Sequence, residues 1–355
     1  MLVAILGDTH LGSRNDHQAF HDYFERFYGD IFFPYLKEHN IKTVIQLGDL
    51  FDRRKYINFY TLKRSREYLF DRLVEAGIHM DVFVGNHDTY FKNTNEVNSP
   101  ELLLKDYAET VSVYSEPVDI EYDGTKMTLL PWVCSGNYEL CLDHINKTDS
   151  QILLGHLELA GFEMYRGAIN DHGMDAKLFD KFDTVMSGHF HHKSSRGNIH
   201  YVGTPYEMTW SDYNDPRGFH IFDTDTRELT FIRNPYSMFQ KWFYDDSSWT
   251  DHSLIDTLDF ESARGSTVKV VVKNKSNPYW FDLYIDRFEK AGVVDLQVVE
   301  DNLNLQLEDD SDIIDEAEDT LTILKNYANM INSSVDNNDL NNFLSMLYTE
   351  ALTVE

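Results

Sequence analysis

Five short segments within the first 191 residues carry side chains that could bind metal ions. Each begins with glycine and contains histidine, aspartate or asparagine, a ligand set that suits Mn, Fe or Zn. Together they supply enough ligands for two divalent ions, and paired metals are a standard means of hydrolysing phosphate esters. The five segments are 7–10 (GDTH), 48–52 (GDLFD), 85–88 (GNHD), 155–156 (GH) and 188–191 (GHFH).

The spacing of these residues predicts how they divide between two ions. The first two ligands alternate through one turn, and the last two histidines are two residues apart, so each pair can share a face. Asp49, at the end of the second predicted strand, is the natural bridging carboxylate. One ion would be held by Asp8, His10, Asp49 and His191. The other would be held by Asp49, Asn86, His156 and His189.

His87 is the residue that we expect to act on the substrate without binding metal. It follows Asn86 directly and should point another way, which leaves its imidazole near the ions as a general acid for a leaving alkoxide. Asp52 lies one short turn beyond the bridging carboxylate and could orient or charge-stabilise His87. The alternative for Asp52 is a carboxylate that starts a helix or forms a salt bridge. His192 should face the surface.

The most basic stretch of the chain follows the second ligand segment. Residues 53–66 hold six lysine and arginine side chains, which begin with Arg53, Arg54 and Lys55. Contact with a phosphate backbone is the functional interpretation of these three residues. A solvated helix face is the alternative.

The predicted elements explain how the ligand segments could meet. Buried strands are expected at 2–7, 43–48 and 80–85, and they alternate with helical stretches at 17–39 and 58–76. This alternation implies parallel strands, and functional groups gather beyond the carboxyl ends of such strands. After residue 110 the pattern changes to a hairpin and further strands. We therefore expect a mixed α/β fold with a two-sheet β-sandwich flanked by helices.

The C-terminal third predicts a different organisation. The unit that carries the ligand segments is expected at 1–240, followed by a polar linker around 240–265 and a small α/β unit at 265–300. An acidic linker is expected at 301–319, since residues 300–319 hold ten acids and no base. Two amphipathic helices are expected within 313–352, and they lack an obvious place in the main core.

Composition limits the possible functions. The 355-residue chain has a net charge of −29, whereas a protein that grips nucleic acid alone is usually basic. No apolar run is long enough for a membrane helix, so we expect a cytoplasmic protein without membrane contact. Cys134 and Cys141 are expected to be reduced. Neither a phosphate-binding GxxxxGK[ST] loop nor a serine nucleophile elbow is present.

The five ligand segments together resemble the calcineurin-like metallophosphoesterase superfamily. Within it, GDTHLG, GDLFDRRK, GTPYE (203–207) and DPRGF (215–219) resemble the SbcD-type double-strand-break repair nucleases. Two longer stretches, 155–167 and 214–224, are similar to the small subunits of T-even-like bacteriophage recombination endonucleases. The resemblance is good over 1–240, moderate over the second unit and weak over the acidic tail.

This resemblance implies a DNA exonuclease and endonuclease with two divalent ions, usually Mn²⁺. It implies a homodimer within a heterotetramer whose other subunit is an SbcC-like, ABC-type coiled-coil ATPase, docked by the C-terminal helices. It also implies a capping role for the small α/β unit, the seven ligands given above and a catalytic His87. Some relatives carry histidine in place of Asp52, and an origin in a phage would place the protein in the host cytoplasm.

Two other functions are compatible with the same residues. A phosphoprotein phosphatase, or another phosphoesterase, shares the GD…DR and GNH patterns, but the second unit and the helical tail are unexpected there. A scaffold with a decayed site is compatible with the fold, but the ligand set is complete. Incubation with Mn²⁺ and either DNA or a phosphopeptide would separate these functions.

Overall fold

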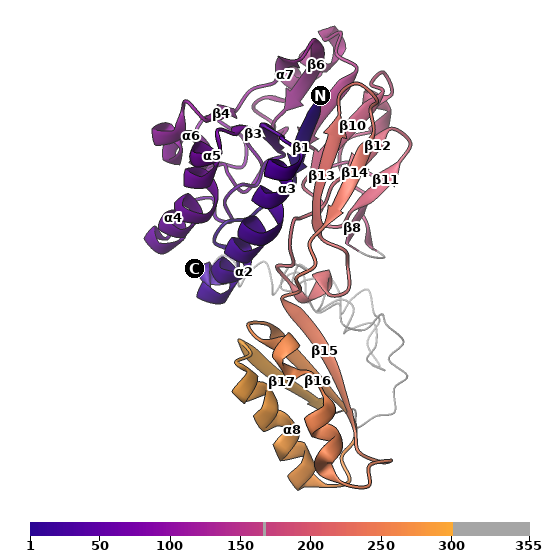
Figure 1. The fold of residues 1–355 in the computed structure, drawn as a ribbon. Coiled ribbons are helices and arrows are strands. Elements are labelled where there is room, and N and C mark those ends of the chain that lie inside the picture. Colours follow the sequence, from indigo (N-terminus) through magenta and orange to yellow (C-terminus); the bar gives the residue numbers. More distant parts are fainter. Residues whose placement is uncertain (166–167, 301–355) are drawn as a thin grey trace, which may run out of the picture. The chain divides into compact units, whose positions relative to one another are not determined.

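Two six-stranded sheets form the larger part of the computed structural model, which describes residues 1–165 and 168–300 (Figure 1). In the first sheet, four parallel strands lie in chain order and two antiparallel strands extend the edge at the first of them. The parallel strands are β1 (Leu2–Leu6), β2 (Thr43–Gln46), β3 (His79–Phe83) and β4 (Val111–Tyr114). The antiparallel ones are β13 (Gly218–Asp223) and β14 (Leu229–Arg233), with β13 paired to β1.

The second sheet combines a parallel centre with antiparallel edges. Its strands are β5 (Val118–Tyr122), β6 (Thr125–Leu130), β7 (Ile152–His156), β10 (Thr184–Gly188), β11 (Ser194–Arg196) and β12 (Ile199–Tyr201). Strands β6, β7, β10 and β12 are parallel, whereas β5 and β11 pair antiparallel at the two edges. A separate hairpin consists of β8 (Glu163–Tyr165) and β9 (Ala168–Ile169). The predicted hairpin turn lies between β5 and β6, at Asp123 and Gly124.

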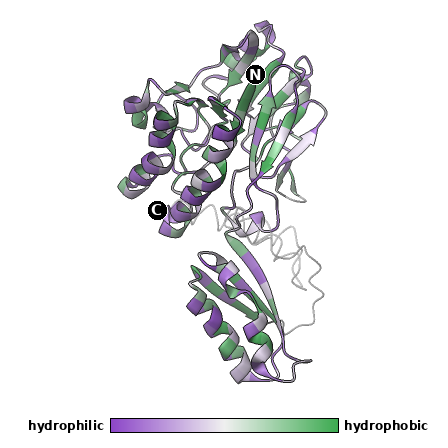
Figure 2. Cartoon of the chain, viewed as in Figure 1, coloured by the Kyte–Doolittle hydropathy of each residue, from purple (hydrophilic) through white to green (hydrophobic). Residues whose placement is uncertain are grey.

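The main core lies between these two sheets. Val3 and Ile45 from the first sheet pack in one buried cluster with Leu129, Leu154 and Met186 from the second. Burying such side chains contributes about 1.5–3 kcal/mol each before the entropy cost of ordering them. Figure 2 shows the hydrophobic residues concentrated on the strands of the sandwich. The predicted fold, a mixed α/β sandwich of two sheets, is confirmed.

Helices cover the outer faces of the sandwich. Two helical runs cross between the parallel strands of the first sheet, and a π-helical turn continues each run, at Tyr28–Phe32 and at Arg66–Phe70. The aromatic side chains of Phe27 and Phe32 contact Phe219 of β13, which fixes the first run against the sheet. The helices of these runs are α2 (Gln18–Phe27), α3 (Phe33–Glu38), α4 (Phe59–Ser65) and α5 (Asp71–Ala76). The others are α1 (Ser13–Asp16), α6 (Ser99–Leu103) and α7 (Tyr138–Lys147), the last packed on the second sheet.

A smaller parallel sheet follows the sandwich in the chain. It contains β15 (Phe239–Asp245), β16 (Thr267–Asn274) and β17 (Asp295–Glu300), with α8 (Pro278–Ala291) packed on one face. The linker expected around 240–265 is therefore wrong at its start, because the first strand of this sheet occupies 239–245. Polar Gln240 and Lys241 hide the strand pattern, whereas Trp242 and Tyr244 point into the small core. Short 3₁₀ turns lie between β15 and β16.

The expected domain boundaries stay predictions. Residues 1–208 and 212–300 form one compact unit, which includes both the sandwich and the small sheet. The acidic linker at 301–319 and the helices within 313–352 lie outside the described residues. Among residues 1–165 and 168–300, no helix has the length and apolarity that a membrane span requires.

Candidate metal centre

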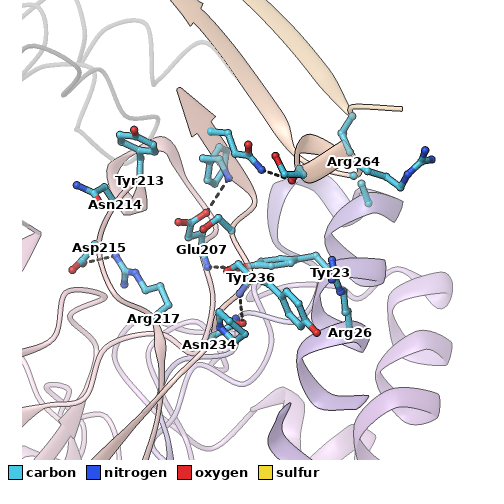
Figure 3. A pocket seen from close by; sticks show the side chains of 18 of the residues that line it. Tyr23, Arg26, Glu207, Tyr213, Asn214, Asp215, Arg217, Asn234, Tyr236 and Arg264 are labelled. Atoms are coloured by element: carbon cyan, nitrogen blue, oxygen red, sulfur yellow. Dashed lines mark hydrogen bonds and ion pairs between the residues drawn. The ribbon is translucent and has the colours of Figure 1, made fainter. Parts of the chain in front are cut away.

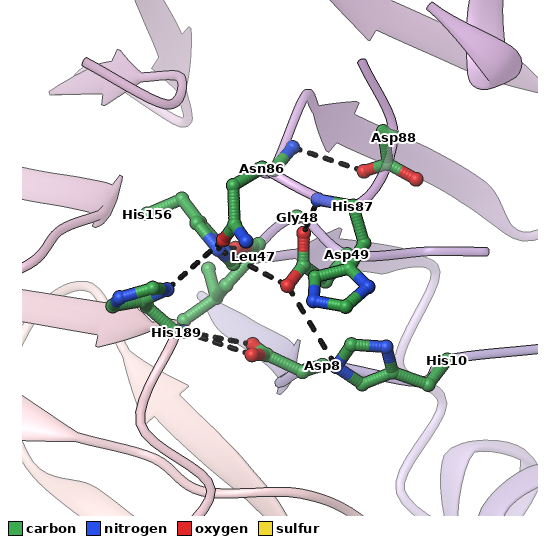
Figure 4. A network of polar contacts seen from close by, with 12 residues as sticks. Asp8, His10, Leu47, Gly48, Asp49, Asn86, His87, Asp88, His156 and His189 are labelled. Carbon is green, nitrogen blue, oxygen red and sulfur yellow. Dashed lines mark hydrogen bonds and ion pairs between the residues drawn. The ribbon is translucent and has the colours of Figure 1, made fainter. Parts of the chain in front are cut away.

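The carboxyl ends of strands from both sheets meet at one edge of the sandwich, and the predicted ligands lie together there (Figure 4). In the first sheet, each ligand segment begins within three residues of the end of β1, β2 or β3. In the second sheet, His156 is the last residue of β7 and His189 follows β10 directly. Parallel strands end at a common edge, so the loops that follow them converge.

The first group contains Asp8, His10 and His191, whose ligand atoms lie within 4.8 Å of one another. The Nε2 atoms of His10 and His191 are 3.1 Å apart and face each other. Asp8 Oδ2 lies 4.0 Å from His191 Nε2. The Asp8 carboxylate also accepts hydrogen bonds from the His189 backbone N–H at 3.0 and 2.9 Å, which joins the loops of the two sheets.

The second group contains Asp49, His156 and His189, again within 4.8 Å. The amide oxygen of Asn86 belongs to the same place, because it lies 2.9 Å from His156 Nε2 and 3.0 Å from His189 Nδ1. The predicted second set of ligands therefore surrounds one small volume.

Asp49, a member of the second group, also lies close to the first. Its Oδ2 atom is 3.7 Å from His10 Nε2 and 3.4 Å from His156 Nε2. Its Oδ1 atom accepts a hydrogen bond from the His87 backbone N–H at 2.7 Å. One carboxylate oxygen thus faces ligand atoms of both groups, which is the position that a bridging ligand requires.

The chemistry of the donors fits divalent cations. His156 Nδ1 donates to the backbone carbonyl of Leu47 at 2.8 Å, so in the neutral ring that a bound metal ion requires, the lone pair is on Nε2. That lone pair faces two further acceptors, Asn86 Oδ1 and Asp49 Oδ2. Acceptors that face one another in a buried site are stabilised by a shared positive charge. Imidazole, amide and carboxylate donors together match Mn, Fe or Zn.

The electrostatic field of the centre attracts positive charge. Burial lowers the pKa of His156, but the negative charges of Asp49 and Asp8 outweigh burial and raise that pKa to about 9. Burial also lowers the pKa of His10, and here Asp52, Asp49 and Asp8 raise it to about 9. The side chains that raise the affinity of these rings for a proton also raise the affinity of the centre for a metal cation.

The family of the chain follows from comparison with known proteins. Residues 1–193, which include the two groups and both sheets' ligand loops, match the calcineurin-like phosphoesterase family. The chain belongs to this family. It is therefore a metal-dependent phosphoesterase, as the order of its ligand segments predicts.

Individual relatives of this phosphoesterase extend beyond the matched range. The chain is 33% identical over 360 residues to exonuclease subunit 1 of Enterobacteria phage T4, and the alignment covers 99% of both chains. It is 24% identical over 319 residues to the SbcD subunit of nuclease SbcCD from Staphylococcus epidermidis, covering 80% of this chain and 79% of that one. The corresponding SbcCD subunit from Staphylococcus saprophyticus is 24% identical over 196 residues, covering 53% and 47%. The resemblance predicted from the motifs is confirmed.

Three predicted ligands of this phosphoesterase have a left-handed backbone. The φ angles are 40° at His10, 51° at Asp49 and 82° at His189. Non-glycine residues rarely adopt this conformation, and it persists only where the surrounding structure enforces it. Part of the enforcement is visible, because the Asp49 carbonyl accepts hydrogen bonds from the Thr9 and His10 N–H groups.

The glycines of the ligand segments allow the loops to approach closely. A Cβ atom on Gly85 would lie 2.2 Å from Asp49 N and Oδ1, and one on Gly188 would lie 2.4 Å from Asp8 Oδ1. Any side chain at these two positions would displace a predicted metal ligand. This contact explains why a glycine precedes a ligand in these segments.

His87 lies beside the two groups, and its ring contacts that of His10 with the centroids 4.7 Å apart. Its Nδ1 atom donates to the backbone carbonyl of Asp52 at 2.7 Å, which orients the ring and leaves Nε2 free to exchange a proton. His87 also forms a third group of possible ligands with His10 and Asp49. Its expected role as a general acid rather than a ligand stays a prediction.

The Asp52 side chain lies close to His10, while its backbone carbonyl contacts His87, so its expected role toward His87 stays a prediction. Its Oδ1 atom lies 3.3 Å from His10 Nδ1, whereas only its backbone carbonyl contacts His87. Burial raises the pKa of Asp52, but the interaction with His10 outweighs burial and lowers it. The carboxylate is thus placed to orient a predicted metal ligand, as outer partners of ligating histidines commonly do.

The basic stretch after Asp52 is partly engaged within the chain. Arg53 donates to Asn15 Oδ1 and to Tyr56 Oη at 2.8 Å, and forms an ion pair with Asp16 at 3.0 Å. Arg54 is half-buried and Lys55 is exposed. Contact of these three residues with DNA stays a prediction, and Lys55 is the most available of them.

Sequence reasoning missed two features that hold the ligand loops in place, and the first is Asp88. Asp88 is fully buried, and its carboxylate accepts backbone N–H bonds from Gly85, Leu50 and Phe51, which ties the second ligand segment to the third. Its position in the GNHD segment could have indicated this role.

The second feature, a cluster around Arg217, holds the last ligand segment. Arg217 donates to the His191 carbonyl and, at 2.7 Å and 2.9 Å, to the carboxylates of Asp212 and Asp215. His192, expected at the surface, is mostly buried, and its Nδ1 lies 2.8 Å from Asp215 Oδ2. The DPRGF motif contains Arg217 and Asp215, and it could have indicated this cluster.

Proposed function

We propose that this phosphoesterase is a DNA nuclease subunit that hydrolyses phosphodiesters with two divalent ions, Mn²⁺ first among them. The observation that carries the proposal is the place of Asp49, whose Oδ2 atom faces His10 on one side and His156 on the other. The names of two relatives, an exonuclease subunit and a nuclease subunit, give the substrate class.

The residues of the chain would divide the work as follows. Two bound ions would activate a water molecule and neutralise charge on the phosphate oxygens. Asp8, His10, Asp49 and His191 would hold one ion, and Asp49, Asn86, His156 and His189 the other. His87, oriented through Nδ1 by the Asp52 carbonyl, would deliver a proton from Nε2 to the leaving sugar oxygen.

The test uses the full chain with Mn²⁺ and three samples: end-labelled duplex DNA, a serine phosphopeptide, and the same DNA with EDTA. We expect cleavage of the DNA that EDTA abolishes, and no release of phosphate from the peptide. Release of phosphate from the peptide without cleavage of DNA would contradict the proposal and favour a phosphoprotein phosphatase. Loss of both activities in a metal-loaded protein would favour a scaffold.

The proposed assembly is a homodimer within a heterotetramer with an SbcC-like, ABC-type coiled-coil ATPase. The word subunit in the names of the relatives supports an assembly. We further propose that the segment 313–352 docks the ATPase, that 301–319 is an acidic spacer and that the small sheet caps the nuclease domain. Removal of 301–355 should abolish co-purification with the ATPase while Mn²⁺-dependent cleavage of simple DNA persists. The cytoplasm, of the host if the chain is of phage origin, is the proposed location.

A further inference from the structure

A short segment links the metal centre to the chain that enters the small sheet. It comprises residues 203–207, and we call it the linking segment. On the side of the metal centre, the Tyr206 hydroxyl donates to the backbone carbonyl of Thr9 at 2.7 Å. Thr9 lies between two predicted metal ligands. Thr204 contacts the last ligand loop, since its N–H donates to the His191 carbonyl at 3.2 Å.

On its other side, the linking segment holds residues 234–239, which we call the root of the small sheet (Figure 3). Glu207 Oε2 accepts hydrogen bonds from the backbone N–H groups of Met238 and Phe239, at 2.7 and 2.9 Å. Phe239 is the first residue of β15. One carboxylate oxygen therefore fixes the peptide at which the small sheet begins.

Further contacts hold the root in the same place. The Tyr23 hydroxyl of α2 donates to the Tyr236 carbonyl at 3.0 Å and accepts the Glu207 N–H at 3.3 Å. Asn234 donates to the Pro205 carbonyl at 3.1 Å. These groups border a cavity of about 740 Å³ that Figure 3 shows from close by. The root is thus held by hydrogen bonds from the sandwich and not only by chain connection.

Burying a glutamate at position 207 lowers the stability of the folded state. Glu207 is 4% exposed, and burying a carboxylate costs several kcal/mol unless hydrogen bonds compensate. Burial raises the pKa of Glu207 to about 7, and the N–H bonds of Phe239 and Met238 oppose this rise, so they supply part of that compensation. An apolar side chain would fill the space at lower cost but would release the root.

A long substrate should depend on the root more than a short one. A small phosphodiester needs only the metal centre, whereas four turns of duplex DNA extend roughly 140 Å and must contact elements beyond it. We propose that Glu207 is a positioning residue, which holds the small sheet in register with the metal centre so that long DNA is bound productively. The proposal rests on the nuclease function proposed above.

The test compares two substrates and three variants of the full chain with Mn²⁺. The substrates are bis(4-nitrophenyl) phosphate and an end-labelled duplex of about four turns. For Glu207→Ala we expect a KM for the duplex raised about tenfold, kcat changed less than about threefold, and turnover of the small diester within about twofold of wild type. Glu207→Gln should restore the duplex KM to within about threefold, because its amide oxygen can accept both N–H bonds. Gln240→Ala, the control, removes hydrogen bonds to Ser262 and from Trp242 within the small sheet region and should change the turnover of neither substrate.

A second measurement needs no substrate. Hydrogen exchange at the Met238 and Phe239 amides should be faster in Glu207→Ala and unchanged in Glu207→Gln. If wild type fails to cleave DNA, the proposed nuclease function is wrong, and the exchange rates still decide the role of Glu207. Equal loss on both substrates, no loss on either, or a Gln variant that behaves like the Ala variant would overturn the proposal.

If Glu207→Ala is insoluble, Tyr23→Phe takes its place. This change keeps the ring and removes only the hydroxyl that bonds Tyr236 and Glu207. We expect a smaller rise in KM, about threefold, for the duplex alone. An unchanged duplex KM in this variant would overturn the proposal.

Discussion

Asp49 faces histidines of both candidate metal-binding groups. We predict that Asp49→Ala loses both ions, whereas Asp8→Ala loses one, because only Asp49 Oδ2 faces histidines of both groups. Elemental analysis after gel filtration should give about two ions for wild type, about one for Asp8→Ala and about none for Asp49→Ala. Equal metal content in the two variants would show that Asp49 does not bridge.

His87 tests the division between holding metal and moving protons. His87→Ala should lower kcat about 10²–10⁴-fold and leave the metal content unchanged, because its Nδ1 is bonded to the Asp52 carbonyl and Nε2 remains for proton transfer. Rate and bound metal are measured on the same preparation. A variant that loses an ion would place His87 among the ligands, as its proximity to His10 and Asp49 allows.

The positions of the candidate ligands could be predicted because each ligand segment begins with a glycine near a strand end. The contacts of Asp52 could not be predicted, since the backbone carbonyl and the carboxylate of one residue serve two different histidines. Sequence spacing places a residue but does not say which of its groups turns inward. The burial of His192 was missed for a related reason, because its partner Asp215 lies in a separate segment.

The helix that follows the second ligand segment exposes unusual apolar surface. Phe59, the first residue of α4, is 87% exposed, and Tyr56 just before it is 63% exposed. Exposed apolar groups of this size mark interaction surfaces. We predict that α4 contributes to the proposed homodimer and that Phe59→Glu shifts the protein toward a monomer in size-exclusion chromatography with light scattering.

A matched variant distinguishes this interface from general solubility. Ile169 is 62% exposed on β9, so Ile169→Glu adds the same charge at another exposed apolar position. That variant should keep the dimer. Dissociation by both substitutions, or by neither, would argue against α4 as the interface.

At the scale of elements, β1 was predictable from its continuous apolar run and β5 and β6 from the turn between them, whereas β15 was not. LVAIL at β1 is apolar throughout, and all of its residues except the first are buried. FQKWFYD at β15 mixes polar and apolar side chains on both faces, since Gln240 shares a face with Trp242 and Tyr244, and exposed Phe243 shares the other with Lys241. Its strand character depends on pairing with β16, which lies more than 20 residues further along the chain.

For the whole molecule, buried neutral histidines predict loss of stability in acid. Burial lowers the pKa of His21 to about 4, and burial with Lys193 and His200 lowers that of His220 to about 3. The unfolded chain binds these protons near pH 6.5, so the folded state loses stability as pH falls from 6.5 toward 4. The upper limit is about 1.4 kcal/mol per pH unit for each histidine.

His220→Leu isolates one of these contributions. Its difference from wild type in the free energy of unfolding, measured with urea at pH 7 and at pH 5, cancels the other titrating groups. The variant should be less sensitive to acid by about 2 kcal/mol over this interval. An identical pH dependence in the two proteins would mean that His220 is protonated in the folded state.

The left-handed backbone at three predicted ligands has a consequence for how this centre could change over evolution. Histidine, aspartate and asparagine are among the few non-glycine residues that tolerate such backbone angles, and they are also metal ligands. Glutamate or cysteine could supply a donor atom at position 10, 49 or 189, but neither shares that tolerance. Backbone and metal therefore restrict these positions to the same small set of amino acids. New metal preferences in this lineage should arise from the surrounding residues or from the ions that the cell supplies, more readily than from exchange of the ligands themselves.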